Sequence, residues 1–138
     1  MFDHCLYFNT SALARRLDQE WSEAFAPFEL SPPQAFMLRA VLDRPGLLQK
    51  ELSDEMSIAK STATRALDFL VAKGYVERRA GTSDAREKCI FPTAKAIAIH
   101  ALLNQASGAV TARLKTMLGP AEFGETVSLI KVVRSALE

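Results

Sequence analysis

Apolar residues recur at helical spacing at both ends of this chain. From about Asp3 to Phe25 they stand mostly three, four or seven positions apart, as on one face of a helix. A second stripe runs from Ala94 to about Leu118, and a third follows the break at Gly119-Pro120. The pattern therefore predicts three long amphipathic helices. Their apolar positions are Leu6, Leu13, Leu17, Trp21, Ala24 and Phe25; Ile99, Leu103, Ala106, Val110, Leu114 and Met117; and Phe123, Val127, Ile130, Val133 and Leu137.

A further helix is marked by its start signals. Ser31 stands directly before Pro32, and Gln34 follows three residues after Ser31. This arrangement combines an N-cap, a proline at the first helical position and the partner of a capping box. It predicts a helix that begins at Pro32 and ends at about Leu42, before Pro45.

Two shorter helices are predicted in the middle of the chain, from Leu47 to about Glu55 and from near Ala59 to the break at Gly74. The second has an apolar stripe and, on another side, a polar arc of about 140°. The stripe is formed by Ala63, Ala66, Leu67, Leu70 and Val71, and the arc by Lys60, Ser61, Thr64, Arg65 and Asp68. One face of this helix is expected to pack against a core, and the other is polar and basic.

The segments YVERR and KCIF are rich in β-formers and are separated by the polar, glycine-containing stretch AGTSDARE. They predict a hairpin that ends at Pro92, and Thr93 is placed to cap the long helix that follows. Two short helices and a hairpin in this order predict a winged helix-turn-helix. The fold class is mainly α with a small β-hairpin wing, in one domain of residues 1–138. Its DNA-binding lobe spans 32–93, and dimerisation helices span 1–30 and 94–138.

The three long helices carry more apolar surface than a module of some 60 residues can cover. Packing within one chain is one explanation. A homodimer interface is the other, and twofold pairing is the commonest oligomeric arrangement.

Charge is unevenly distributed along the chain. The formal net charge is only +1, but residues 57–95 hold eight basic and four acidic residues, whereas the remainder has an acidic excess. A basic module on a mildly acidic body suits a surface that faces phosphate groups. With 49% hydrophobic residues and no apolar run near the roughly 20 residues of a membrane span, we expect a cytoplasmic protein.

The polar arc is suited to double-stranded DNA. Small polar and basic side chains can hydrogen-bond to base edges in the major groove, and Lys60, Ser61, Thr64 and Arg65 lie in the half of the helix that such proteins insert. Ser57 and Ser61 are candidates for contacts with phosphate oxygens. The alternative for Ser57 is that it only caps the helix.

Four cations lie near the tip of the predicted hairpin: Arg78, Arg79, Arg86 and Lys88. Asp84 is unfavourable beside phosphate, so we expect it to orient Arg86 or to tie the loop backbone. Arg86 is then directed at the adjacent minor groove. An ordinary surface ion pair is the alternative.

Several spaced motifs resemble those of the MarR family of bacterial transcriptional regulators, and the resemblance spans essentially the whole chain. The family's Q-x-x-L-[AS] pattern is matched by Gln49, Leu52 and Ser53. Its recognition-helix pattern is matched by Ser61, Thr62, Leu70, Lys73, Gly74, Tyr75 and Val76, and its wing pattern by Asp84, Arg86 and Thr93. Pro92 and Ala96 depart from it, which leaves open where the next helix begins.

The resemblance implies a homodimer that contacts successive major grooves of a pseudo-palindrome, usually as a repressor. It also implies a small phenolic or lipophilic effector bound between the dimerisation helices and the winged module, and it implies no cofactor. A protein-interaction module without DNA binding is the less favoured alternative, because interaction surfaces favour aromatic anchors. An enzyme is not expected, because His4 and His100 lack catalytic companions at useful spacing.

Cys5 raises a second regulatory hypothesis. The segment from Asp3 to Phe8 is similar to the first helix of the organic hydroperoxide regulators in this family, which use a reactive cysteine. His4 could favour the thiolate, although neighbouring helical positions point about 100° apart. The alternatives for Cys5 are a redox sensor and an inert apolar residue in a dimer interface, and Cys89 is expected to serve packing.

Overall fold

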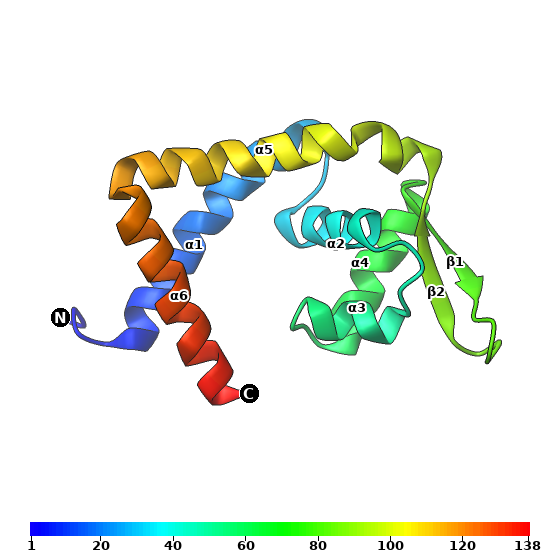
Figure 1. The fold of residues 1–138 in the computed structure, drawn as a ribbon, viewed down its shortest axis with the longest axis horizontal. Coiled ribbons are helices and arrows are strands. Elements are labelled where there is room, and N and C mark those ends of the chain that lie inside the picture. Colours follow the sequence, from blue (N-terminus) through cyan, green and yellow to red (C-terminus); the bar gives the residue numbers. More distant parts are fainter.

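The computed structural model describes all residues, 1–138, and places two groups of helices at opposite ends of one long helix (Figure 1). The winged module lies under one end of this helix, α5, and α6 descends from the other end, while α1 meets α5 nearer its middle; both chain termini lie at the ends of α1 and α6 away from α5. The elements are α1 (Leu6–Phe25), a 3-10 turn (Ala26–Phe28), α2 (Pro32–Asp43), α3 (Gln49–Glu55), α4 (Lys60–Ala72), β1 (Val76–Ala80), β2 (Lys88–Pro92), α5 (Ala94–Leu118) and α6 (Pro120–Leu137).

The start signals of two helices have the predicted geometry. The Ser31 hydroxyl accepts a hydrogen bond from the Gln34 backbone amide, and the Gln34 side chain accepts one from the Ser31 amide, which completes the capping box of α2. The Thr93 hydroxyl accepts from the amide of Ala96 and caps α5. The departures from the family pattern at Pro92 and Ala96 therefore leave α5 starting at Ala94.

The wing is a two-stranded antiparallel sheet in which Val76 pairs with Pro92 and Ala80 with Lys88. It is held to the rest of the module by backbone hydrogen bonds, since the amide of Gly46 donates to Ile90 and the amide of Ile90 donates to Leu47. The helix before the wing ends at Gly74, whose φ of +78° is a left-handed conformation that favours glycine. The hairpin and its preceding break are thus confirmed.

A core of 16 buried residues joins the winged module to α5 and to the end of α1, and α6 contributes none of them. Helix α2 is central to it, because five of its twelve residues are buried and it contacts α1, α3, α4, α5 and β2. Phe25, Leu67, Ile90 and Leu103 bring α1, α4, β2 and α5 into the same core. The position of the winged module is therefore fixed to α5 by packing as well as by the chain.

Two details of the predicted pattern are wrong. Helix α1 begins at Leu6 instead of about Asp3, because the sulfur of Cys5 takes the capping position and accepts from the amide of Phe8. Val71, predicted in the buried stripe of α4, is exposed near the end of that helix. Met117 of the apolar stripe of α5 is 77% exposed near the end of α5.

Helix α6 has no buried residue, although it is amphipathic in sequence. Its exposed large apolar side chains are Val127, Leu129, Ile130, Val132, Val133 and Leu137. The apolar excess predicted for the long helices is therefore present on the surface of the single chain. None of the helices is long and apolar enough to cross a membrane.

Candidate nucleic-acid interface

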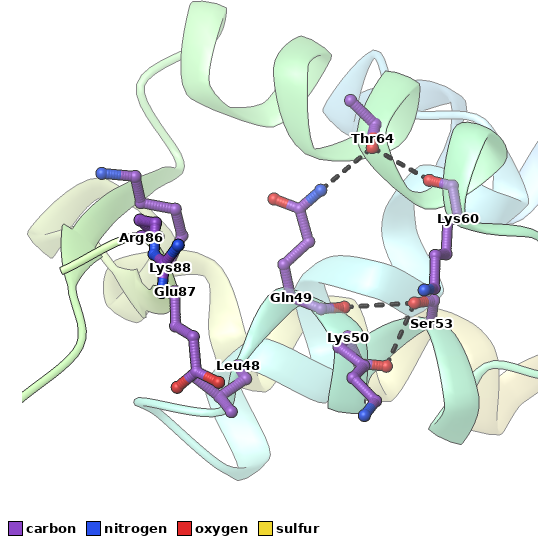
Figure 2. Close-up of a pocket in the computed structure, with 9 residues that line it drawn as sticks. All are labelled: Leu48, Gln49, Lys50, Ser53, Lys60, Thr64, Arg86, Glu87 and Lys88. Carbon is purple, nitrogen blue, oxygen red and sulfur yellow. Dashed lines mark hydrogen bonds between the residues drawn. The ribbon is translucent and has the colours of Figure 1, made fainter. Parts of the chain in front are cut away.

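An open groove of about 380 Å³ lies between α3, the start of α4 and the wing. Figure 2 shows its lining: Leu48, Gln49, Lys50, Ser53, Lys60, Thr64, Arg86, Glu87 and Lys88. Four of these are cations and only Leu48 is hydrophobic. Residues far apart in the sequence thus form one basic, polar concavity.

The polar face of α4 is available to a ligand. Lys60 and Thr64 line the groove, and Ser61 and Arg65 are exposed beside it. Thr62 is half-buried, next to the fully buried Ala63. The structure therefore brings Lys60 and Thr64 to the groove, leaves Ser61 and Arg65 on the open helix surface, and keeps Thr62 partly covered.

Asp84 contacts Arg86 in the loop of the wing. Its Oδ1 accepts from the Arg86 backbone amide at 2.9 Å and from Nε of the same residue at 3.3 Å. The loop is closed further because the amide of Glu87 donates to the carbonyl of Asp84. The backbone tie expected of Asp84 is present, whereas its contact with Nε of Arg86 is an ion pair at the surface, where the Arg86 side chain is 93% exposed.

The other two wing arginines do not line the groove. Arg79 pairs with Glu77, and its guanidinium lies over the Phe91 ring, 4.2 Å from the centroid. Arg78 points to α3 and α4, where it donates to Gln49 and to Asp68. Of the four cations predicted near the tip, only Arg86 and Lys88 lie together in the groove.

Ser57 does not cap α4, so that interpretation is wrong. The N-cap is Ala59, which has no side-chain acceptor. Ser57 ends α3 in a left-handed conformation with φ of +55°, and its hydroxyl accepts from the Arg134 guanidinium of α6 at 3.1 Å. It is exposed at the turn, outside the groove.

Five of the nine lining residues of the groove were not among the candidates: Leu48, Gln49, Lys50, Ser53 and Glu87. Gln49 was recognised only as a motif position, and Lys50 was not singled out, yet both contribute to the lining. The position of Gln49 and Lys50 in the sequence could have indicated this, because they lie at the start of α3, the helix that precedes the recognition helix α4, and this turn of α3 faces α4. A cation at the start of this short helix adds to the positive charge of the groove.

The winged segment also matches a known family model. Residues 28–87 match the model of the MarR family. The regulator YybA of Bacillus subtilis, an uncharacterised HTH-type transcriptional regulator, is 27% identical over 127 residues, which is 91% of this chain and 84% of YybA.

Solved structures of this family have the same fold over nearly the whole chain. A mutant of E. coli MarR complexed with operator DNA has a TM-score of 0.85 at 24% identity, over 96% of this chain and 97% of that one. The PcaV regulator of Streptomyces coelicolor, in complex with its natural ligand, has a TM-score of 0.82 at 23% identity over 100% of both chains.

The chain belongs to the MarR family. It is therefore a DNA-binding transcriptional regulator with a winged-helix fold, and members of this family are not enzymes. Because this family binds DNA, a DNA-binding function is favoured over the alternative of a protein-interaction module without DNA binding.

A second concave surface of this MarR-family protein lies between α2, α3 and α5. It encloses about 430 Å³ and is lined by Phe36, Arg39, Ala40, Asp43, Glu55, Met56, His100 and Asn104. Arg39 is fixed there, since its Nε donates to Asn104 at 2.8 Å, one Nη donates to Ser107 at 3.1 Å, and its guanidinium lies 5.0 Å from the Phe36 centroid. Burial lowers the pKa of Arg39 below its ordinary value, but an arginine remains charged at neutral pH.

The cysteines occupy different settings. Cys5 is exposed at the start of α1, with its sulfur 3.5 Å from the amide nitrogen of Phe8. Cys89 is half-buried in β2. The contact of Cys5 is a helix cap, and the thiol-sensor hypothesis stays a prediction from the resemblance.

Proposed function

We propose that this regulator is a homodimeric repressor that binds a pseudo-palindromic operator and releases it when a small-molecule ligand binds. In each protomer, α4 enters the major groove and the wing contacts the adjacent minor groove. The proposed DNA-binding residues are Ser57, Lys60, Ser61, Thr62, Thr64, Arg65, Arg79, Asp84, Arg86 and Lys88, together with Lys50.

One observation supports the proposed DNA-binding surface: cations from α3, α4 and the wing line a single groove. Lysine and arginine at such a surface neutralise phosphate groups, while Thr64 and the open face of α4 are available for base edges. Arg79 and Ser57 have partners within the protein, so we assign them to the margin of the interface.

The test is a fluorescence-polarisation titration with fragments selected from the source genome, repeated at several salt concentrations. We expect the logarithm of the affinity to fall linearly with the logarithm of the salt concentration, because bound phosphates release counterions. The selected fragments should share two half-sites about 10 base pairs apart, or a multiple of that spacing. A slope near zero, or selected fragments without a common sequence, would contradict the proposal.

Dimerisation is supported by the apolar surface of α1 and α6. A groove of about 460 Å³ lies between them, and six of its eight lining residues are hydrophobic. These residues are Leu6, Tyr7, Thr10, Leu129, Ile130, Val133, Arg134 and Leu137. Apolar surface of this extent on a soluble chain marks an interaction site, and a second copy brings the same surface to meet it.

Ligand response is supported by the crevice around Arg39. Its lining has an aromatic wall and a fixed cation, Arg39, which can bind a small aromatic anion such as a phenolic carboxylate, and two carboxylates, Asp43 and Glu55, which disfavour ligands of higher negative charge. Because α2 and α5 line it, an occupant contacts both the winged module and the helix that joins this module to the proposed dimer interface. A ligand that favours one separation of the two recognition helices then changes operator affinity.

We expect 4-hydroxybenzoate, as a probe of this chemistry, to weaken operator binding by the parent protein, and Arg39→Met to abolish the response. Methionine keeps much of the volume of the side chain but removes the cation. The measurement is operator affinity with and without millimolar probe, alongside the thermal midpoint. Arg113→Met is the matched control, since Arg113 is an exposed arginine paired with Glu20 and neither residue lines the crevice. Equal responses of the parent and Arg39→Met would exclude this site as the point of action.

A further inference from the structure

A chain of hydrogen bonds joins the wing to the recognition helix through α3. Arg78 on β1 donates from Nε to Oε1 of Gln49 at 3.2 Å and from Nη2 to Asp68 on α4 at 2.7 Å. Gln49 in turn donates from Nε2 to Oγ1 of Thr64 at 3.0 Å, and Thr64 donates to the carbonyl oxygen of Lys60 at 2.9 Å (Figure 2).

In each of these hydrogen bonds the donor and the acceptor can be assigned. An arginine can only donate, so the Gln49 atom that faces Arg78 must be its amide oxygen. The amide nitrogen of Gln49 therefore faces Thr64 and donates to it. A carbonyl can only accept, so the hydroxyl proton of Thr64 lies on the bond to Lys60.

The hydroxyl of Thr64 consequently has no proton left for a ligand. One lone pair is taken by Gln49, so Thr64 can offer a ligand only the remaining lone pair and its methyl group. We propose that Gln49 and Arg78 are positioning residues that fix Thr64 as an acceptor, so that Thr64 is a specificity-determining residue that disfavours guanine. This inference rests on the proposed entry of α4 into the major groove.

Base chemistry gives the expected preference. In the major groove adenine and cytosine present amino groups that donate, and thymine presents a methyl group. Guanine presents only its N7 and O6 acceptors there, which need a donor. Thr64 can accept from adenine or cytosine and can contact the thymine methyl, but it leaves guanine unpaired.

Arg78 differs from the groove cations in its surroundings. Its side chain is only 25% exposed, and its guanidinium is bonded to Gln49 and Asp68. By contrast, Arg86 is 93% exposed. Arg78 therefore acts on DNA recognition through Gln49 and Thr64, and not as a phosphate contact.

The experiment is selection of bound sequences from a random duplex library, followed by affinity measurements on single-base variants of the preferred site. The variants are Gln49→Ala, Arg78→Ala, Arg78→Lys and Thr64→Val, with Arg44→Lys as the matched control on an exposed arginine. Thermal melts and binding to mixed-sequence DNA report whether each variant is folded.

For the parent we expect guanine to be disfavoured at one base of each half-site by at least about fivefold. Gln49→Ala and Arg78→Lys should reduce this discrimination, because an untethered Thr64 can take its second helical rotamer and donate. Lysine keeps the charge of Arg78 but lacks the planar fork that binds two partners. Arg78→Ala should leave the salt slope unchanged, and Thr64→Val should lose the preference for adenine or cytosine while guanine stays disfavoured.

Three results would overturn the proposal while leaving the proposed function intact. The first is that Gln49→Ala and Arg78→Lys keep the base preferences of the parent. The second is that Thr64→Val does not change these preferences. The third is that the salt slope of Arg78→Ala falls by about one per protomer, which marks a phosphate contact. If the parent itself selects no common sequence, the proposed function fails instead.

Discussion

A protein carrying Leu129→Asp and Leu137→Asp is expected to be a monomer that binds a two-half-site operator at least about 100-fold more weakly than the parent. The two leucines are 59% and 84% exposed on α6 and line the apolar groove beside α1. Burying each in a dimer is worth about 1.5–3 kcal/mol, and a carboxylate in its place must be desolvated as well. A monomer also loses the joint binding of two recognition helices.

Sedimentation velocity measures the oligomeric state, and fluorescence polarisation measures operator affinity. Ser128→Asp combined with Ser135→Asp is the matched control, because it adds the same two charges at exposed positions of α6 that do not line the groove. The control should remain dimeric. A dimeric double variant would show that the apolar surface of α6 has another purpose.

Most of the fold could be predicted because its signals are local. The capping box at Ser31, the cap at Thr93 and the break at Gly74 each depend on residues within a few positions of one another, and all three have the predicted geometry. Helix α5 likewise has the predicted bounds, Ala94 to Leu118. Such patterns fix where elements begin and end whatever the tertiary structure.

The predictions fail where a side chain binds a residue far away in the sequence. Ser57 was expected at the start of α4, but it binds Arg134, 77 residues away, and the helix is capped without a side chain. The wing arginines are equivalent in sequence, yet Arg78 turns toward Gln49 and Asp68, whereas Arg86 stays in solvent. No spacing rule distinguishes them, because the difference arises from the packing of the wing against α3 and α4.

The Arg39 crevice was not predicted for a similar reason. Phe36 and Arg39 lie one turn apart on α2, where they suggest an ordinary helix surface, and Asn104 and Ser107 lie on α5, more than 60 residues later. Only the crossing of α2 and α5 brings them together.

The local charge excess of residues 57–95, by contrast, was visible in sequence. Most of the acids within this segment form ion pairs with arginines: Asp68 with Arg78, Glu77 with Arg79 and Asp84 with Arg86.

Arg86 has the largest expected effect among single side chains of the interface. Asp84 ties the backbone of Arg86 and contacts its Nε, while nearly all of the side chain is exposed and accessible to DNA. An arginine at this position of the wing can enter a minor groove, where its charge is favoured. Lys88 in the same groove is a flexible cation without an ion-pair partner in the protein, so its removal is expected to matter less.

We therefore expect Arg86→Ala to weaken operator binding by about 5- to 150-fold and to reduce the salt slope by about one for each wing. Asp84→Asn should weaken binding by less, since the asparagine oxygen can still accept from the Arg86 amide but lacks the charge that pairs with the guanidinium. The measurement is a salt-dependent polarisation titration of each variant. Arg44→Ala serves as the control, because this arginine pairs with Glu55 and does not line the groove. An Arg86→Ala protein with parental affinity and slope would remove the wing from the interface, whereas a loss confined to Asp84→Asn would place the effect in the fold of the loop.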